Sequence, residues 1–263
     1  MRELRVATWE AFNAWHVQRD GWAFRGEEHA SWPLLSSLAR RFMQMQVPHE
    51  LWREREERAL RVFRRKAHVY LPDRTILEDT LRCLAMMQHH GAPTRLLDFT
   101  KSPYVAAYFA LENALGESAV YALNTPLLAT LAAAHDATLT RDAIDPRLPG
   151  HFERFFTAGT QPLVWFGEPS EMDRRLVAQS GLLVVPGVID TPLPTLLATY
   201  RTDTPLIEKV VLAHSMRRDA MHALYRMNVT QATLFPDLDG LARSIAYELE
   251  EAWPLPDRPE RRV

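Results

Sequence analysis

The sequence predicts an α+β fold in which a mixed or antiparallel central sheet is joined to an N-terminal helical lobe. Helix and strand patterns follow one another without the regular alternation that builds a parallel α/β sheet. Amphipathic helix patterns gather between residues 33 and 90, whereas most strand patterns come later. At 263 residues, with no repeat and no low-complexity linker, the chain is within the range of one domain. We therefore expect a single domain over 1–263, with 33–90 as the helical lobe and 252–263 as a C-terminal tail.

The elements before residue 90 are marked by capping residues and prolines. Thr8 is expected to cap a helix that carries Trp9, Phe12 and Trp15 on one side. A short strand over 22–24 should follow. Prolines suit the first turn of a helix, and Asp is a good cap. On these grounds helices are expected at 33–45, 48–70 and 73–88.

The later elements are read in the same way. Thr94–Phe99 is expected to form a strand, and Ser102 and Pro103 to open a helix that extends to Leu111. The loop prediction for residues 136–150 depends on their polarity and on two prolines. The remaining strands are expected at 118–123, 161–166, 182–185 and 207–213, and the remaining helices at 125–135, 169–179, 215–227 and 236–249.

Composition limits the function classes. No apolar run reaches the roughly 20 residues that span a membrane, and the N-terminus lacks an apolar signal core. A single cysteine, Cys83, cannot form an intrachain disulfide, so we expect a cytoplasmic protein without membrane partners.

Charge gives little support to nucleic-acid binding. The formal net charge of −2 provides no general attraction to nucleic acid. Between Glu50 and Lys66 there are seven basic and four acidic residues. This pattern favours a solvated helix face over a nucleic-acid-binding strip.

The stretch from Gln88 to Ala110 is the most informative part of the chain. It packs two histidines, a glycine, a Pro-Thr-Arg turn, Asp98 and Thr100 in front of an apolar helix. A strand that ends in polar side chains and leads into a helix N-terminus is a common way to build a site. Asp98 and Thr100 could bind a ligand there, or they could cap and order the turn.

Arg25 and His89 each have two interpretations. Arg25, at the end of a short strand and followed by Gly26, could hold a phosphate or carboxylate with its planar fork. It could equally tie the strand to a neighbouring carboxylate. His89 could act as a general base, or it could be favoured at a helix C-terminus by the helix dipole. No histidine or carboxylate lies at an i,i+4 ligand spacing there, so no metal is expected.

A third polar group lies on the helix expected at 169–179. Glu171, Arg175 and Gln179 are spaced four apart and share one face. A solvated helix face is the ordinary reason for such a row. The other interpretation is that the row faces a ligand.

Three motifs together resemble a known family, the FRG domain, named for Phe-Arg-Gly. They are Phe24-Arg25-Gly26, then Gln88-His89 with Thr94-Arg95-Leu96-Leu97-Asp98 and Thr100, and finally Leu234-Phe235-Pro236-Asp237-Leu238. The resemblance extends from Trp9 to Tyr247, and members look similar at Arg175, Gln179 and Gly181.

An analogy with ADP-ribosyltransferase folds goes with this resemblance. Those folds place an Arg on an early strand, a Ser/Thr-bearing strand before a helix, and a later Glu or Gln. Arg25, then Asp98 with Thr100, then Glu171 or Gln179 follow that order. Two features depart from the pattern: there is no Ser-Thr-Ser run, and only Glu208 lies in a clear C-terminal strand.

We therefore expect an NAD-dependent ADP-ribosyltransferase-like enzyme or an NAD glycohydrolase, of the kind used as a bacterial toxin or defence effector. NAD would be the substrate, with no metal, and the acceptor would be an unidentified macromolecule or small molecule. The alternatives are a non-catalytic module that binds an anionic ligand and a metal-independent nuclease that uses His89, Arg95 and Asp98. The expected NAD-binding residues are Arg25, Gly26, Arg95, Asp98 and Thr100, and the expected catalytic residues are Glu171, Gln179 and His89.

Overall fold

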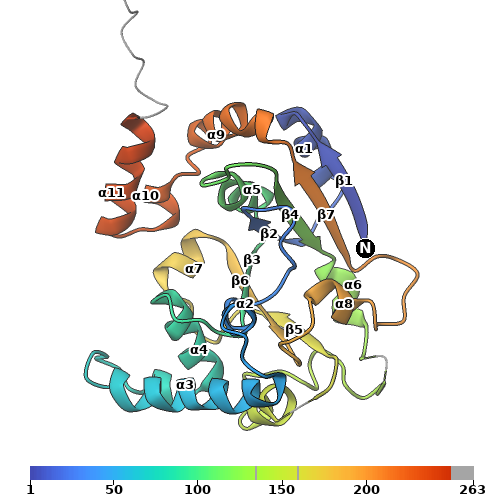
Figure 1. The fold of residues 1–263 in the computed structure, drawn as a ribbon, viewed down its shortest axis with the longest axis vertical. Helices are drawn as coiled ribbons and strands as arrows, with labels where there is room; N and C mark the ends of the chain where they lie inside the picture. The colour runs from blue at the N-terminus through green and yellow to red at the C-terminus, as the bar shows by residue number, and fades with distance from the viewer. Residues whose placement is uncertain (134, 159, 250–263) are drawn as a thin grey trace, which may run out of the picture.

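A computed structural model describes residues 1–133, 135–158 and 160–249, so the tail expected at 252–263 lies outside the described residues. Its centre is a seven-stranded sheet with the order β1-β7-β4-β2-β3-β6-β5 (Figure 1). β1 runs parallel to β7, and the other neighbouring strands of this sheet pair antiparallel. The expected α+β class with a mixed sheet is confirmed. The strands are β1 (Arg2–Val6), β2 (Ala23–Glu27), β3 (Leu97–Thr100), β4 (Ser118–Leu123), β5 (Val164–Gly167), β6 (Gly181–Pro186) and β7 (Ile207–Leu212).

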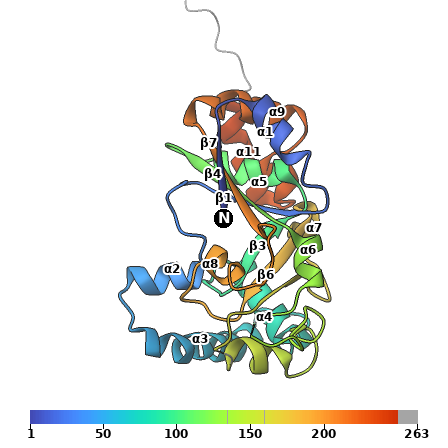
Figure 2. The same ribbon diagram turned by 90° about the vertical axis from the view of Figure 1, so that its right-hand side faces the viewer.

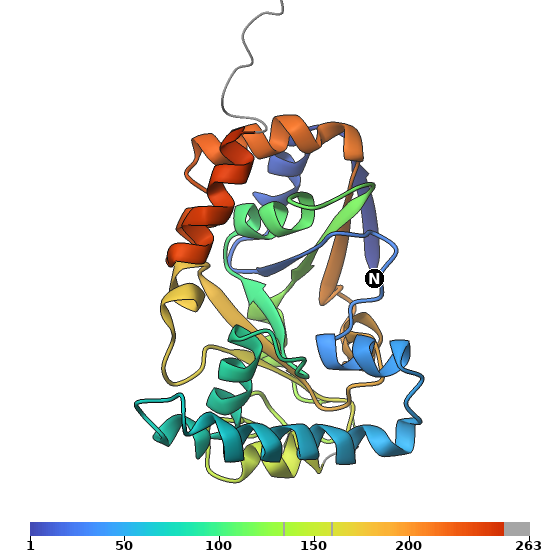
Figure 3. The same cartoon turned by 60° about the vertical axis from the view of Figure 1, so that its left-hand side comes forward.

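Helices gather at both ends of the sheet. In Figure 1, α9 and α11 lie at one end of the molecule and α3 with α4 at the other, and Figure 2 shows the strands running between these ends. Figure 3 shows α3 extending across its end. None of the helices in the described ranges is long and apolar enough to cross a membrane. The helices are α1 (Trp9–His16), α2 (Ser37–Gln44), α3 (Trp52–Ala67), α4 (Thr80–His89), α5 (Pro103–Leu111), α6 (Thr125–Thr130), α7 (Arg174–Ala178), α8 (Leu193–Leu197), α9 (Arg217–Arg226), α10 (Gln231–Leu234) and α11 (Leu238–Tyr247), with shorter turns η1 (His49–Leu51), η2 (Thr75–Leu77), η3 (Phe152–Thr157) and η4 (His214–Met216).

Helix starts differ from the predictions where an aspartate further along the chain sets the first turn. Asp79 accepts from the Arg82 amide at 3.0 Å and starts α4, so the helix expected at 73–88 divides into η2 and α4. Asp173 starts α7 through the Leu176 amide at 2.9 Å, and Asp237 starts α11 through the Gly240 amide at 2.8 Å. A carboxylate satisfies an amide that the helix leaves free, whereas proline only tolerates the position.

The sheet is almost divided between β2 and β3. These strands pair at one position, Phe24 with Thr100. β2 pairs with β4 over five positions and β3 with β6 over four. The sheet therefore consists of two halves, β1-β7-β4-β2 and β3-β6-β5, that touch at one residue pair. Beyond this pair no ladder joins β2 to β3.

α5 covers the sheet next to this junction. Ala106, Ala107 and Ala110 are fully buried against the cluster that contains Phe24. A Cβ on Gly26 would lie 2.1 Å from the Ala106 carbonyl oxygen. The glycine of Phe24-Arg25-Gly26 is therefore required for the close approach of α5 to β2.

We expect Gly26→Ala to destabilise the fold by about 3 kcal/mol, because backbone atoms of α5 cannot yield as a side chain can. Chemical denaturation measures this. Gly116→Ala is the matched control, since a Cβ at Gly116 would meet nothing within 4 Å. Equal stability of the two variants would contradict the steric explanation.

Candidate functional site

The candidate site begins where β2 and β3 diverge. The Arg25 Nη1 donates to the carbonyl oxygen of Asp98 at 2.8 Å, and its Nε donates to Glu27 Oε1 at 2.8 Å. The guanidinium thus joins the two halves of the sheet beside the Phe24–Thr100 pair. Both sequence interpretations of Arg25 apply to it: it pairs with a carboxylate, and it lines a cavity.

That cavity, which we call the split-sheet cavity, has a volume of about 360 Å³. This size is within the range of small-molecule sites. Its polar lining comes from β2, the following loop, α2, β3 and the segment before β6. The lining includes Arg25, Glu27, Glu28, Trp32, Arg40, Asp98, Thr100, Arg175 and Gln179.

Two further hollows adjoin it. A recess of about 50 Å³, the histidine recess, is lined by Gln88, His89 and Asp173 and shares Asp98, Arg175 and Gln179 with the split-sheet cavity. An open cleft of about 880 Å³, the α11 cleft, shares His89 and Arg175 with the recess and reaches Arg243 on α11. Arg175 lines all three hollows, so they lie next to one another around its side chain.

Asp98 is the carboxylate at the centre of this site. Asp98 is exposed to solvent, yet desolvation by the surrounding protein raises the pKa of its carboxyl, against the opposing attraction of Arg25. Gln88 Nε2 donates to Asp98 Oδ1 at 2.6 Å, and the Thr94 hydroxyl donates to the amide oxygen of Gln88. Thr94 and Gln88 therefore fix the orientation of the carboxylate.

The raised pKa of Asp98 predicts how stability depends on pH. Between the ordinary aspartate pKa and the raised one, the folded protein binds more protons than the unfolded chain, so stability falls as pH rises. Above both values the desolvation penalty of the ionised carboxylate is fully present. We expect Asp98→Asn to melt at a higher temperature than wild type at pH 7, and the difference to vanish below the ordinary aspartate pKa.

Asp73→Asn is the control with the opposite sign. Hydrogen bonds from Thr75 lower the pKa of Asp73, so its stabilising effect is present at pH 7 and lost in acid. Thermal melts from pH 3 to pH 8 compare the two. A lower melting temperature for Asp98→Asn at pH 7 would show that the ionised carboxylate is stabilising.

The wall of the split-sheet cavity carries both cations and carboxylates. Buried Glu27 accepts from Arg25 and from Arg40 Nη1, the latter at 3.2 Å. Glu27 and Asp98 raise the pKa of Arg25, although burial opposes them. The Arg175 guanidinium lies 4.1 Å from the centre of the Phe235 ring. Burial lowers the pKa of Arg175. The lining holds the guanidinium groups of Arg25, Arg40 and Arg175 and the carboxylates of Glu27, Glu28 and Asp98, so attraction for an anion comes from individual guanidinium groups and not from an excess of positive charge.

Thr100 and Gln179 hold the elements of the site together. The Thr100 hydroxyl donates to the Gln179 carbonyl oxygen at 2.6 Å and accepts from the Ser102 amide at 3.0 Å. Gln179 Nε2 donates to the Leu234 carbonyl oxygen at 3.1 Å. Thr100 therefore orders the turn into α5, as its second interpretation expects, while both residues also line the cavity.

His89 forms a pair with Asp173. Its Nδ1 lies 3.1 Å from Asp173 Oδ2, and the other carboxylate oxygen of Asp173 caps α7. Because the cap fixes Asp173, the imidazole is held in one orientation. His89 lines both the histidine recess and the α11 cleft.

Three of the expected site residues, Glu171, Arg95 and Gly26, either lie outside the three hollows or have a structural role. Glu171 is largely exposed, pairs with Arg82 and does not line any of the three hollows. Arg95 is buried against Glu56 and the Phe156 carbonyl oxygen. Gly26 reaches the split-sheet cavity, but its lack of a side chain is explained by α5.

Sequence reasoning missed several site residues. They are Glu27, Trp32, Arg40, Gln88 as a partner of Asp98, and Asp173. Only Glu27 carries a local signal, since it is on the same strand as Arg25. Asp173 reads as an ordinary helix cap, and α2 approaches β2 only in three dimensions.

Comparison with known proteins gives one family match. Residues 20–119 match the model of the FRG domain, as the motifs predict. The matched segment includes Arg25, Gly26, His89, Asp98 and Thr100, whereas Arg175 and Gln179 follow it. No curated protein and no solved structure matches the chain.

Proposed function

The chain carries an FRG domain, and we propose that its site binds NAD and cleaves the bond between nicotinamide and ribose. The protein would be an ADP-ribosyltransferase-like enzyme, or an NAD glycohydrolase when water is the acceptor. One observation carries the proposal. Arg25, Asp98 with Thr100, and Gln179, which the fold analogy expects to act together, line one cavity although they come from separate segments.

The guanidinium groups suit the pyrophosphate of NAD. Arg25 keeps Nη2 beyond its bonds to Glu27 and Asp98, and Arg175 lies at the junction of the three hollows. Arginine binds phosphate with two parallel hydrogen bonds and stays charged. We assign pyrophosphate binding to Arg25 and Arg175.

Asp98 supplies the negative charge that the reaction needs. As the C1′–N bond breaks, its electron pair moves to the pyridinium nitrogen, nicotinamide leaves neutral, and positive charge develops on the ribose. A fixed carboxylate stabilises that charge in the transition state. Glu171 lies outside the hollows, so we assign this role to Asp98 instead of Glu171, with Gln179 beside it. Activity should fall in acid as Asp98 becomes protonated.

The His89–Asp173 pair suits the acceptor side of the reaction. If His89 Nδ1 donates to Asp173, its Nε2 is free to take the proton from a water or hydroxyl acceptor as the oxygen bonds to C1′. The α11 cleft, about 880 Å³ in volume, gives the acceptor access to His89.

Nicotinamide release from NAD by the purified protein tests the proposal. We expect release by wild type and a fall of about 100-fold in His89→Ala, the lower end of general acid–base contributions. His222→Ala is the matched control, because His222 is exposed on α9 and does not line any of the three hollows. Without release by wild type, with or without hydroxyl acceptors, the enzyme proposal fails.

A non-catalytic module for an anionic ligand is the second candidate. The engagement of Thr100 and Gln179 in structural hydrogen bonds favours it. Calorimetry separates the two, since a module would bind NAD or another anion without releasing nicotinamide. The nuclease alternative has less support, because Arg95, which it would use, is buried against Glu56. A cytoplasmic setting and a role as a toxin or defence effector belong to the enzyme proposal.

A further inference from the structure

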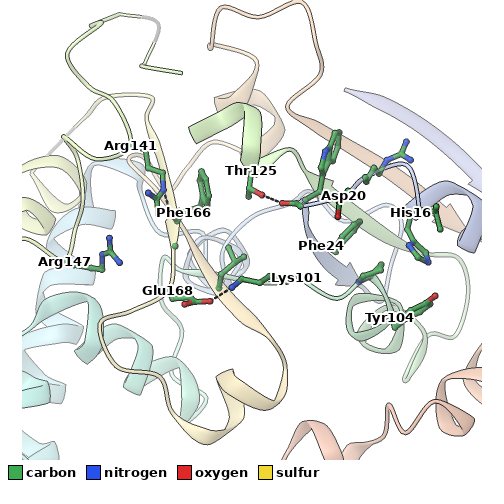
Figure 4. A pocket seen from close by; sticks show the side chains of 17 residues that line it. His16, Asp20, Phe24, Lys101, Tyr104, Thr125, Arg141, Arg147, Phe166 and Glu168 are labelled. Carbon is green, nitrogen blue, oxygen red and sulfur yellow. Dashed lines mark hydrogen bonds and ion pairs between the residues drawn. The ribbon is translucent and has the colours of Figure 1, made fainter. Parts of the chain in front are cut away.

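A second cleft lies on the other side of the Phe24–Thr100 pair, with a volume of about 800 Å³ (Figure 4). We call it the Arg141 cleft. Phe24 is the one lining residue that it shares with the split-sheet cavity. Figure 4 shows Arg141, Arg147 and Phe166 on one side and His16 and Tyr104 on the opposite side. None of these residues was part of the proposed NAD site.

The basic side of the cleft is held in place by the protein. Arg141 Nε donates to the Phe166 carbonyl oxygen at 3.0 Å, and its guanidinium lies 4.9 Å from the centre of the Phe166 ring. Arg147 binds Asp145 through Nε and Nη2 and lies 5.5 Å from the Trp165 ring. Arg141 Nη1 also pairs with exposed Asp142 at 3.1 Å, so Nη2 of Arg141 and Nη1 of Arg147 are the nitrogens left for a ligand. Two guanidinium groups fixed in this way lose little conformational entropy when they bind an anion.

Lys101 adds a third cation at the base of the cleft. Its ammonium group pairs with Glu168 and is well exposed (Figure 4). Arg19 also lines the cleft, but its charge is matched by buried Glu208. Among the lining side chains, the positive charges of Lys101, Arg141 and Arg147 are therefore opposed by the negative charges of Asp20 and Glu168.

The opposite side offers flat rings. His16 and Tyr104 meet edge to face, with ring centres 5.0 Å apart, and Trp22 lines the same cleft. Burial lowers the pKa of His16, which favours the neutral imidazole at pH 7. An uncharged aromatic surface suits stacking against a planar heterocycle.

We propose that the Arg141 cleft binds a nucleotide, with its phosphate toward Arg141 and Arg147 and its base against Tyr104 and Trp22. A single ligand must offer both a strong anion and a flat ring to match the two sides, and a nucleotide combines these. The volume is within the 300–1,000 Å³ range of small-molecule sites. This inference does not depend on NAD cleavage in the split-sheet cavity.

Calorimetry with AMP, adenosine and inorganic phosphate tests the site. We expect wild type to bind AMP, and each fragment to bind at least about 10-fold more weakly, because each fragment engages one side of the cleft only. Absence of AMP binding by wild type overturns the proposal. So does phosphate binding as tight as that of AMP, which would indicate an anion site without base recognition.

Variants locate the AMP. Arg141→Gln and Arg147→Gln should each weaken AMP binding about 10-fold or more, and Lys101→Gln should weaken it less. Arg154→Gln is the matched control, since Arg154 is exposed and does not line the cleft. Arg25→Ala should leave AMP affinity unchanged. Loss of AMP binding in Arg25→Ala, with retention in the Arg141 and Arg147 variants, would move the ligand to the split-sheet cavity and overturn the inference.

Folding of the variants is checked by thermal melts. Arg147 holds Asp145, so Arg147→Gln could unfold the loop around it. Lys101 makes one exposed ion pair, and its removal is expected to change stability by less than about 1 kcal/mol. A folded Lys101→Gln protein with unaltered AMP affinity, together with folded Arg141→Gln of unaltered affinity, would also contradict the proposal.

Discussion

Arg25→Ala should lower nicotinamide release from NAD by about 100- to 1,000-fold, the range typical for removing one electrostatic contact to a transition state. Arg25 donates to the Asp98 carbonyl oxygen and is the cation that acts most strongly on the Asp98 carboxyl. Steady-state kinetics with NAD measure the effect. Arg25→Lys should recover part of the activity, because it restores the charge without the planar fork.

The fold should survive this substitution. Glu27 keeps Arg40 as a partner, so the buried carboxylate is not left alone. The Asp98 carbonyl oxygen loses a donor at the edge of an open cavity, which costs about 1–3 kcal/mol. Arg40→Ala is the companion variant, since it leaves Arg25 on Glu27. An Arg25→Ala protein that is folded and fully active would remove Arg25 from the site.

Arg95→Ala should have the largest effect on stability, a loss of about 3–5 kcal/mol. Arg95 and Glu56 are both buried and form a two-point ion pair, and Arg95 Nη1 also donates to the Phe156 carbonyl oxygen at 2.5 Å. Removal of the arginine leaves the Glu56 charge buried without its partner. Urea denaturation followed by circular dichroism measures the loss.

Two controls separate this structural role from NAD binding. Arg61→Ala breaks the exposed pair with Glu57 and should cost less than about 1 kcal/mol. The double variant Arg95→Met with Glu56→Leu should recover much of the stability, because both charges are removed together. Its KM for NAD should equal that of wild type. A raised KM in a stable double variant would return Arg95 to the ligand-binding residues.

The fold could be predicted where local patterns decide it. The strand at 118–123 matches β4, because apolar and aromatic side chains fill every position after Ser118 of a strand buried on both faces. The helix at 103–111 matches α5, whose cap, Ser102, accepts from the Val105 amide at 3.3 Å. Strand β1 was missed because four of its five residues are exposed, so no apolar alternation marks it.

The site could be predicted only in part, because its second half depends on contacts that no local pattern reveals. The order Arg25, Asp98, Thr100 and Gln179 identified residues that line one cavity. Glu171 and Gln179 share one periodic row, yet α7 begins at Arg174, so the row is not a single helix face. Glu56 lies 39 positions before Arg95, and its burial among exposed neighbours on α3 could not be read from a charged segment.

The third motif acts through Arg175. Asp237 caps α11, and Phe235 places its ring against the Arg175 guanidinium and edge to face with Phe109 on α5. Asp237 therefore has a structural role in this motif. The position of this motif next to Arg175 depends on the contact between Phe235 and Arg175, which are 60 residues apart in the chain.

The pairing of β1 with β7 sets a time scale for synthesis. Arg2 lies opposite Glu208 in a parallel ladder, a separation of 206 residues. At about 5–20 residues per second, a ribosome needs on the order of 10–40 s to reach the partner strand after residue 2 has been made. Throughout that interval β1 has no neighbour, so the sheet can be completed only after nearly all the other strands have been synthesised.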